Sequence, residues 1–162
     1  MKQKIKARKG LLKIVKDLKA KGKRIVFTNG CFDLLHIGHV RYLEEAKTRG
    51  DVLVVGVNSD SSVRKLKGPK RPILPEEERT EVLSGLGCVD YVALFHEIDP
   101  LKLITSLHPD VLVKGGDCTK EQIVGREVVE RSGGEVVIIP FVKGASTSHL
   151  IQTILKKYEK RT

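Results

Sequence analysis

Two histidines, His36 and His39, stand three residues apart around Gly38, close to the point where a helix must begin. Side chains at this spacing lie on the same side of a helical turn. The free N–H groups and the dipole of a helix N-terminus attract phosphate. The two imidazoles could therefore hold a polyphosphate and stabilise the charge that builds on a phosphorus atom under attack. The alternative is a turn that does no chemistry.

A metal site is a second chemical interpretation of this segment, because Asp33, His36 and His39 are residue types that bind zinc. No further ligand stands nearby in the sequence, so we expect no metal site. Cys31 belongs to the same motif, but no base or resolving thiol accompanies it, and we expect its side chain to pack.

Three further segments carry groups that suit phosphates or nucleotides. Lys65, Lys67 and Arg71 belong to a basic segment with glycine and proline, which we interpret as a lid that grips phosphates, the alternative being a solvated surface loop. Residues 114–117 contain paired glycines, which let the backbone approach a ligand closely. Residues 146–148 offer three hydroxyls at the start of a predicted helix, where a cap alone needs one.

The elements that must position these segments follow from the hydrophobic pattern. Short apolar runs predict buried strands at 24–28, 51–58, 91–95, 111–113 and 135–139. Helical spacing predicts helices at 1–22, 39–49, 75–86, 100–107, 119–132 and 148–158, and the polar stretch 58–72 reads as a loop.

The alternation of strands and helices predicts an α/β fold: a doubly wound, five-stranded parallel sheet of Rossmann-like type with an extra N-terminal helix. In such a sheet the loops after the first, fourth and fifth strands converge on one cleft. The 162 residues suit a single domain, with the helix of 1–22 preceding a catalytic core at 24–157.

Composition narrows the class of partner. The net charge of +10 favours anionic ligands, but aromatic residues are only 4% of the chain and none alternate with the lysines. The stacking platform that single-stranded nucleic acid requires is therefore missing. No apolar run is long enough to span a membrane, and no signal peptide is visible, so we expect a cytoplasmic protein that binds neither membrane nor nucleic acid.

Residues 30–39, GCFDLLHIGH, match the Gly-x-Phe-Asp-x-x-His-x-Gly-His signature, so the chain resembles the cytidylyltransferase-like nucleotidyltransferases. Residues 146–148 resemble the second signature of that family, with Ser148 where many members have a threonine. TNGCFD, RPILP, VDYV, PDVLVKGGD and GGEVVIIP further resemble the adenylyltransferase domains of ADP-heptose synthesis, and the likeness covers residues 24–157.

The resemblance implies transfer of AMP from ATP to D-glycero-β-D-manno-heptose 1-phosphate, in carbohydrate metabolism that serves the inner core of lipopolysaccharide. It implies direct in-line attack on the α-phosphate, with Mg²⁺ bridging phosphate oxygens. The catalytic residues it implies are His36, His39, Lys65 and Lys67. The nucleotide-binding residues it implies are Thr28, Asn29, Gly30, Cys31, Phe32, Gly38, Arg71, Arg79, Lys114, Gly115, Gly116, Asp117, Ser146, Thr147 and Ser148.

Some questions stay open at this stage. A cytidylyltransferase that acts on glycerol 3-phosphate is the nearest rival, and a non-catalytic anion binder is a more distant one. A surface helix charge is an equal alternative for Arg79. The resemblance also implies a sugar kinase in the same pathway, which we expect to be a separate chain, and a homodimer is compatible with the sequence.

Overall fold

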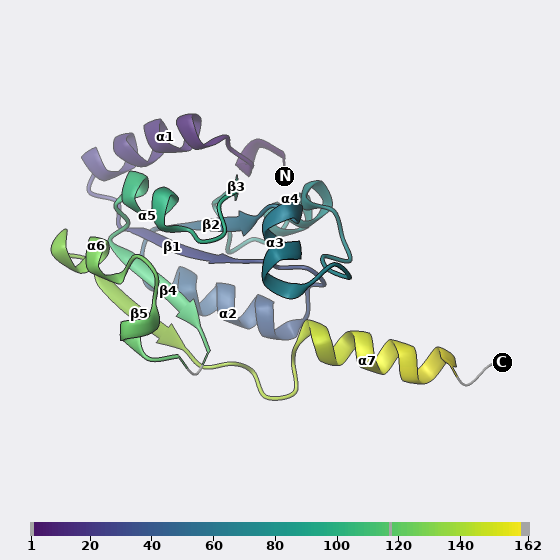
Figure 1. The fold of residues 1–162 in the computed structure, drawn as a ribbon. Coiled ribbons are helices and arrows are strands. Elements are labelled where there is room, and N and C mark those ends of the chain that lie inside the picture. The colour runs from purple at the N-terminus through teal and green to yellow at the C-terminus, as the bar shows by residue number, and fades with distance from the viewer. Residues whose placement is uncertain (1, 117, 160–162) are drawn as a thin grey trace.

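The computed structural model describes residues 2–116 and 118–159. Its centre is one sheet of five parallel strands in the order β3-β2-β1-β4-β5 (Figure 1). The strands are β1 (Ile25–Gly30), β2 (Val52–Asn58), β3 (Tyr91–Phe95), β4 (Val111–Gly115) and β5 (Glu135–Ile139). The predicted α/β fold with a five-stranded parallel sheet is confirmed. The chain leaves β1 toward one edge and returns to its other side with β4, so the switch point lies between β1 and β4.

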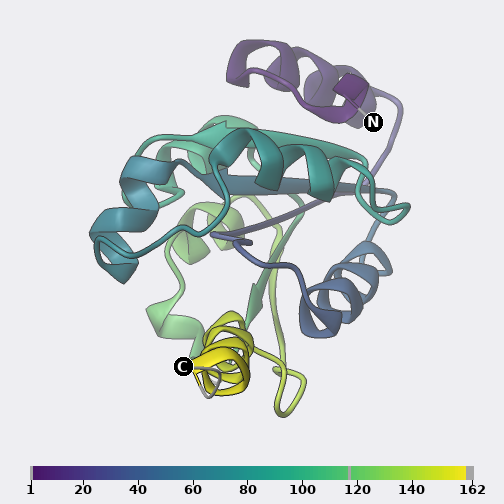
Figure 2. The ribbon, with the colours of Figure 1, turned by 90° about the vertical axis from the view of Figure 1, so that its right-hand side faces the viewer.

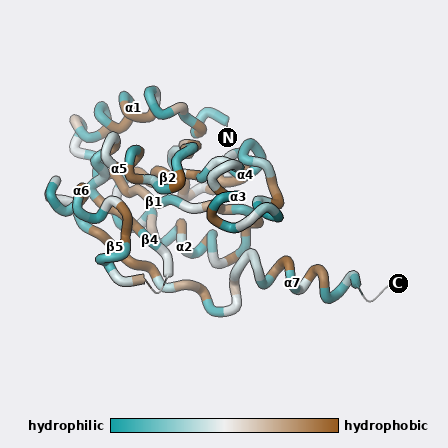
Figure 3. Tube along the Cα trace, in the orientation of Figure 1, coloured by the Kyte–Doolittle hydropathy of each residue, from teal (hydrophilic) through white to brown (hydrophobic). Residues whose placement is uncertain are grey.

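Helices cover both faces of the sheet, as the unbroken apolar strands require. One face packs against α1 (Arg8–Ala20), α5 (Leu101–Leu107) and α6 (Arg126–Arg131). The other face packs against α2 (Ile37–Lys47) and α4 (Glu76–Ser84). Figure 3 shows the result, with brown apolar strands inside and outer helices that alternate between brown and teal. Two hydrophobic cores thus hold the strand ends in fixed positions.

The N-terminal segment is joined to this sheet. A short helix, η1 (Lys2–Lys4), precedes an isolated parallel bridge between Ile5 and Val92 of β3. Leu11 and Val15 of α1 are buried in the same core as α5. This segment therefore contributes to the core, although it lies far from the residues with predicted chemistry.

Three expected elements differ in the structure. The predicted N-terminal helix of 1–22 is divided into η1 and α1, with the bridge at Ile5 between them. The predicted loop of 58–72 contains a helix, α3 (Asp60–Lys67), whose N-cap Ser59 accepts a hydrogen bond from the Ser62 N–H. The helix was not predicted, because its sequence has too few apolar residues to show a helical repeat. The predicted helix of 119–132 is split into η2 (Lys120–Gln122) and α6, and Gly125 between them has a φ of +88° that ends regular helix.

The last helix, α7 (Thr147–Tyr158), projects from the body of the molecule in Figure 1 and is seen end-on in Figure 2. None of its residues is buried, and its N-terminal turn is the part that lies beside β1 and α2. Within the described part of the chain, no helix is long and apolar enough to cross a membrane.

Candidate active site

The predicted convergence of the strand-end loops is seen as a single cavity of about 1000 Å³. It lies at the C-terminal ends of the strands, around the switch point between β1 and β4. Most residues with predicted roles line it: Asn29, Gly30, Cys31, Phe32, His36, Gly38, His39, Lys67, Arg71, Lys114, Gly115, Ser146, Thr147 and Ser148. Sequence segments more than a hundred residues apart therefore meet in one place.

The histidine pair stands at the start of α2. His36 is the N-cap residue of that helix, and its ring stacks on the ring of His39 with centroids 3.9 Å apart. The ring of Phe32 lies beside that of His39, with centroids 5.3 Å apart. The Nδ1 atoms of both imidazoles are buried and have no hydrogen-bond partner among the described residues. Each ring therefore reaches a ligand through Nε2.

The surroundings of the two imidazoles set their charge. Burial lowers the pKa of His36 below its usual 6.5. Burial, and then the neighbouring His36, lower the pKa of His39 to about 4. Both rings are therefore neutral near pH 7, and a neutral imidazole has one N–H donor and one acceptor. With Nδ1 enclosed and unpaired, a proton on Nε2 gives each ring a donor that faces the cavity.

The start of α7 packs against the segment between β1 and α2, residues 31–36, which we call the histidine loop. A Cβ atom added at Gly38 would stand 3.1 Å from the Cβ of Ala145 and 2.9 Å from Nδ1 of His36. The Thr147 hydroxyl donates to the carbonyl of Leu34 at 3.3 Å. The helices α2 and α7 thus present their N-terminal turns to the same cavity. This arrangement concentrates backbone donors suited to phosphate.

Ser146 is the N-cap of α7. Its side-chain oxygen accepts a hydrogen bond from the His149 N–H at 3.0 Å. The hydroxyl proton of Ser146 is not used in that bond, so it can still be donated to an anion. Ser148 lines the cavity beside it. The hydroxyl of Ser146 thus caps α7, and that of Thr147 bonds to the histidine loop. The hydroxyls of Ser146 and Ser148 can donate to phosphate.

Asp33 links the histidine loop to the segment that follows α3. Its buried carboxylate accepts hydrogen bonds from Nε of Arg71 and from the backbone N–H groups of Ile73 and Leu74. Burial alone would raise the pKa of Asp33, but these donors outweigh it and hold the pKa below the usual value. The carboxylate is thus an anchor that aims Arg71 at the cavity.

Lys114 places an ammonium group at the switch point between β1 and β4. Its ammonium donates to the side-chain oxygen of Asn29 at 3.4 Å, and so connects the ends of β4 and β1. Burial lowers the pKa of Lys114 from its usual range. A partly desolvated ammonium binds an incoming phosphate or carbonyl oxygen more strongly than one in open water.

Four of the described residues with predicted roles do not line the cavity: Thr28, Lys65, Gly116 and Arg79. Thr28 is fully buried, and its hydroxyl pairs with that of Tyr42 at 2.5 Å. Lys65 lies exposed on α3 outside the lining, so two of the three predicted cations of the basic segment, Lys67 and Arg71, line the cavity. Gly116 lies next to the ring of Phe141. Asp117 falls outside the described residues.

Arg79 is the fourth, and one of its two expected environments, an exposed helix surface, is wrong. Its side chain is fully buried, which excludes a surface helix charge. Its guanidinium donates to the carbonyls of Leu74, Cys31 and Asn58 and to the carboxylate of Asp60. Arg79 therefore crosslinks the ends of β1 and β2 beneath the cavity and does not line it.

Sequence reasoning missed several lining residues that follow β3 and β5. Ile98, Asp99 and Pro100 come after β3, and Phe141 comes after β5. Their signal was available, because in a parallel sheet every strand end points to the same edge. Their residue types carry no obvious chemistry, which is why the sequence drew attention elsewhere.

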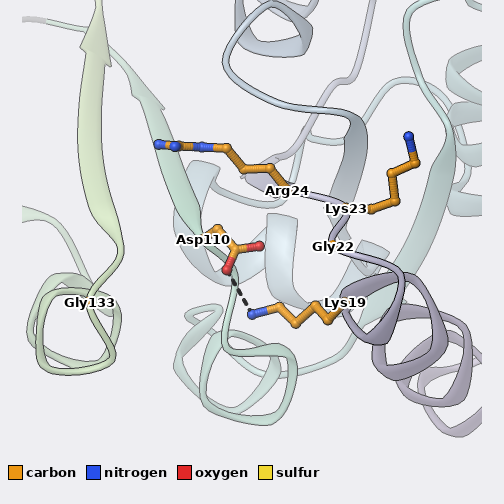
Figure 4. A pocket seen from close by; sticks show the side chains of 6 residues that line it. All are labelled: Lys19, Gly22, Lys23, Arg24, Asp110 and Gly133. Atoms are coloured by element: carbon orange, nitrogen blue, oxygen red, sulfur yellow. Dashed lines mark hydrogen bonds and ion pairs between the residues drawn. The ribbon is translucent and has the colours of Figure 1, made fainter.

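A second hollow, of about 380 Å³, lies at the opposite end of the strands (Figure 4). Its cations are paired with carboxylates: Lys19 contacts Asp110 at 3.0 Å, and Arg24 contacts Glu135 at 2.7 Å. Doubly wound sheets bind ligands at the carboxyl ends of their strands, so this hollow is not the candidate active site.

Comparison with known proteins tests the family resemblance. The sequence pattern of the Cytidylyltransferase-like family matches residues 27–157. The chain belongs to the cytidylyltransferase-like family. The match includes both the histidine loop and the first turn of α7, the two segments that the cavity brings together.

Individual relatives of this cytidylyltransferase-like chain agree. It is 58% identical over 155 residues to the bifunctional protein HldE of Geobacter metallireducens and 56% identical to that of Trichlorobacter lovleyi. These alignments cover 96% of the chain but 32% of each relative, so the chain spans about a third of their length. A crystal structure of the lipopolysaccharide core biosynthesis protein of Thermoplasma volcanium is 36% identical, with a TM-score of 0.62 over 75% of this chain and 98% of that one.

Proposed function

We propose that the chain is an adenylyltransferase that transfers AMP from ATP to D-glycero-β-D-manno-heptose 1-phosphate, giving ADP-heptose and pyrophosphate. One observation carries this proposal: two stacked imidazoles, whose Nδ1 atoms are buried, line a cavity that also receives the N-terminal turns of α2 and α7. This arrangement suits a polyphosphate. The similarity to HldE proteins and to a lipopolysaccharide core biosynthesis protein supports the heptose substrate.

In the proposed reaction, an oxygen of the sugar phosphate attacks the α-phosphorus of ATP in line with the bond to the β-phosphate. The new P–O bond forms as the bond to pyrophosphate breaks, and no enzyme atom is covalently bound to AMP. Binding places the two reactants together, and donors stabilise the charge on the α-phosphate and on the departing pyrophosphate. His36 and His39 supply such donors at the start of α2.

The proposed reaction needs no general base, because a phosphate monoester is already largely ionised at pH 7. The buried carboxylate in the cavity lining agrees with this. Asp33 is occupied by Arg71 and two backbone N–H groups, so it is not free to remove a proton from a substrate.

Mg²⁺ is proposed to enter as part of the nucleotide substrate. Among the described residues, no cluster of three His, Cys, Asp or Glu side chains is placed to hold a metal ion. The protein groups therefore do not fit a dedicated magnesium site. Mg²⁺ commonly keeps several waters and binds through substrate phosphates, so the triphosphate itself would be its main ligand.

Supply of the sugar 1-phosphate requires a kinase activity. The HldE relatives are called bifunctional and are about three times as long as this chain, so a kinase as a separate chain and one fused to this domain are both compatible with the proposal. We also propose a cytoplasmic location, where ATP is available. A homodimer is a further proposal, which the exposed apolar residues Ile154, Leu155 and Tyr158 of α7 support.

A cytidylyltransferase acting on glycerol 3-phosphate is the second candidate, favoured by the family description. The test is pyrophosphate release with Mg²⁺, crossing ATP or CTP with heptose 1-phosphate or glycerol 3-phosphate. The proposal expects release with ATP and heptose 1-phosphate alone. Release only with CTP and glycerol 3-phosphate would favour the second candidate, and no release in any pair would contradict both.

A further inference from the structure

Phe141 differs from the other phenylalanines of the chain. The side chains of Phe27, Phe32 and Phe95 are at most 5% exposed, whereas Phe141 is 69% exposed. Phe141 follows Pro140 directly after β5 and lines the large cavity. An exposed aromatic ring forgoes the stabilisation that burial gives, so its place in the cavity calls for an explanation other than packing.

Gly115 at the end of β4 and Gly116 after it lie close to the outer atoms of the ring. A Cβ atom added at Gly115 would stand 3.3 Å from Cε1 of Phe141, and one added at Gly116 would stand 2.9 Å from Cε2 and 3.0 Å from Cζ. These three atoms form the outer edge of the ring. Gly116 also has a φ of +124°, which L side chains rarely adopt. The two glycines therefore admit the ring, and the side chain remains 69% exposed.

The open ring shares its cavity with groups that suit phosphate. Lys114 immediately precedes the two glycines, and the histidine pair and the first turn of α7 line the same space. A ligand that uses all of these groups has a flat aromatic part and a polyphosphate part. A sugar phosphate has no flat ring, whereas a nucleoside triphosphate has both.

We propose that Phe141 is the stacking platform for the base of the nucleoside triphosphate, and that Gly115 and Gly116 are present to seat its ring. This inference rests on the proposed function of the cavity and names one more residue for nucleotide binding. Stacking of a base on an aromatic side chain depends little on which base it is. Phe141 is thus assigned to nucleotide affinity and orientation, and the choice of adenine over cytosine falls to other groups.

A direct test uses the absence of tryptophan from the sequence. Phe141→Trp introduces a single indole whose fluorescence reports on its surroundings. We expect MgATP to change this fluorescence with saturation, and inorganic tripolyphosphate, which has similar charges but no base, to leave it nearly unchanged. A signal that responds to protein concentration and not to MgATP would overturn the proposal, because it would indicate that another protein surface covers the ring.

The matching affinity test uses Phe141→Ala, with Tyr158→Ala as the control because Tyr158 is equally exposed at 69% and lies outside the cavity lining. Calorimetry should show the dissociation constant for MgATP rising about 5- to 150-fold in Phe141→Ala, with that for tripolyphosphate unchanged. Unchanged MgATP affinity, or equal losses for both ligands, would contradict the platform. Because these readouts are of binding, failure of AMP transfer in the unmodified protein would be recognised separately by the pyrophosphate assay.

Discussion

The imidazole rings of His36 and His39 stack with their centroids 3.9 Å apart and their planes inclined by 23°. Two imidazolium cations at this separation would repel each other, and burial disfavours the charged form of both rings. The stacked pair is therefore a pair of neutral donors, held ready by α2 before any ligand arrives. Such preorganisation stabilises a transition state without reorganisation during the reaction.

Removing either ring tests this role. We expect His36→Ala and His39→Ala each to lower turnover by about 100-fold or more, as the loss of a preorganised donor to a transition state does. His96→Ala is the matched control, because His96 is exposed and does not line the cavity. The measurement is the rate of pyrophosphate release, with circular dichroism to verify the fold. Near-normal turnover in both variants would rule out the assigned role.

Acid should destabilise the protein through His39. Its folded-state pKa of about 4 lies below the ordinary 6.5 expected in the unfolded chain. Between these values the unfolded chain binds more protons, so the free energy of unfolding falls as pH decreases from about 6.5 to about 4. His36 acts in the same direction. Urea unfolding from pH 7.5 to 4.5 should show a shallower loss for His39→Asn than for the unmodified protein, and equal losses would refute the linkage.

Gly38 should be intolerant of any side chain. A Cβ atom there would meet the His36 ring at 2.9 Å and Ala145 at 3.1 Å, so Gly38→Ala must displace the histidine or the segment that leads into α7. We expect turnover to fall by at least about tenfold, since small misplacements of catalytic groups are costly. Gly10→Ala is the control: nothing lies within 4 Å of its Cβ position in α1. That variant should keep full activity and unfold at equal or slightly higher urea concentration.

Asp33 should matter through the position of Arg71. Asp33→Asn keeps the size of the side chain but weakens its bonds to the guanidinium of Arg71 and to the N–H groups of Ile73 and Leu74. We expect a raised KM for the phosphate-containing substrates, with a smaller change in kcat. Steady-state kinetics alongside Arg71→Ala provides the measurement. If Arg71→Ala leaves KM unchanged, Arg71 does not bind phosphate.

The sequence was sufficient to locate the cavity because strand ends are marked by local features. The apolar run before Asn29 stops at a glycine and two histidines follow, and the run before Lys114 ends in a pair of glycines. In a parallel sheet such ends share one edge, so local patterns determine a long-range meeting point. The same rule predicts that Phe141, which follows β5, lines the cavity. Its apolar side chain is the reason that it was not predicted as a site residue.

The environment of Arg79 could not be read from its neighbours. The segment EEERTE is strongly polar and predicts an exposed helix surface. The side chain is buried because carbonyl groups at Cys31 and Asn58, far away in the sequence, end β1 and β2 beside α4 and need donors. This need for hydrogen-bond donors arises only when the sheet is assembled, so the sequence pattern of α4 does not indicate it.

Arg79 should consequently be a major determinant of stability. Arg79→Met removes a buried guanidinium that donates to three carbonyl groups and to Asp60, and leaves those acceptors without it. We expect the free energy of unfolding to fall by about 3 kcal/mol or more. Arg79→Lys keeps the charge but has one nitrogen and no planar fork, so it should recover only part of this loss.

The matched control is Arg49→Ala, which breaks an exposed pair with Glu45 on α2 and should cost about 0.5 kcal/mol or less. Urea unfolding curves of the four proteins give the comparison. Because Arg79 contacts the carbonyl of Cys31 in the histidine loop, the Lys variant should also lose turnover at temperatures where it remains folded. If Arg79→Lys matched the unmodified protein in stability, the geometry of the guanidinium would be irrelevant and the charge alone would explain the burial of this arginine.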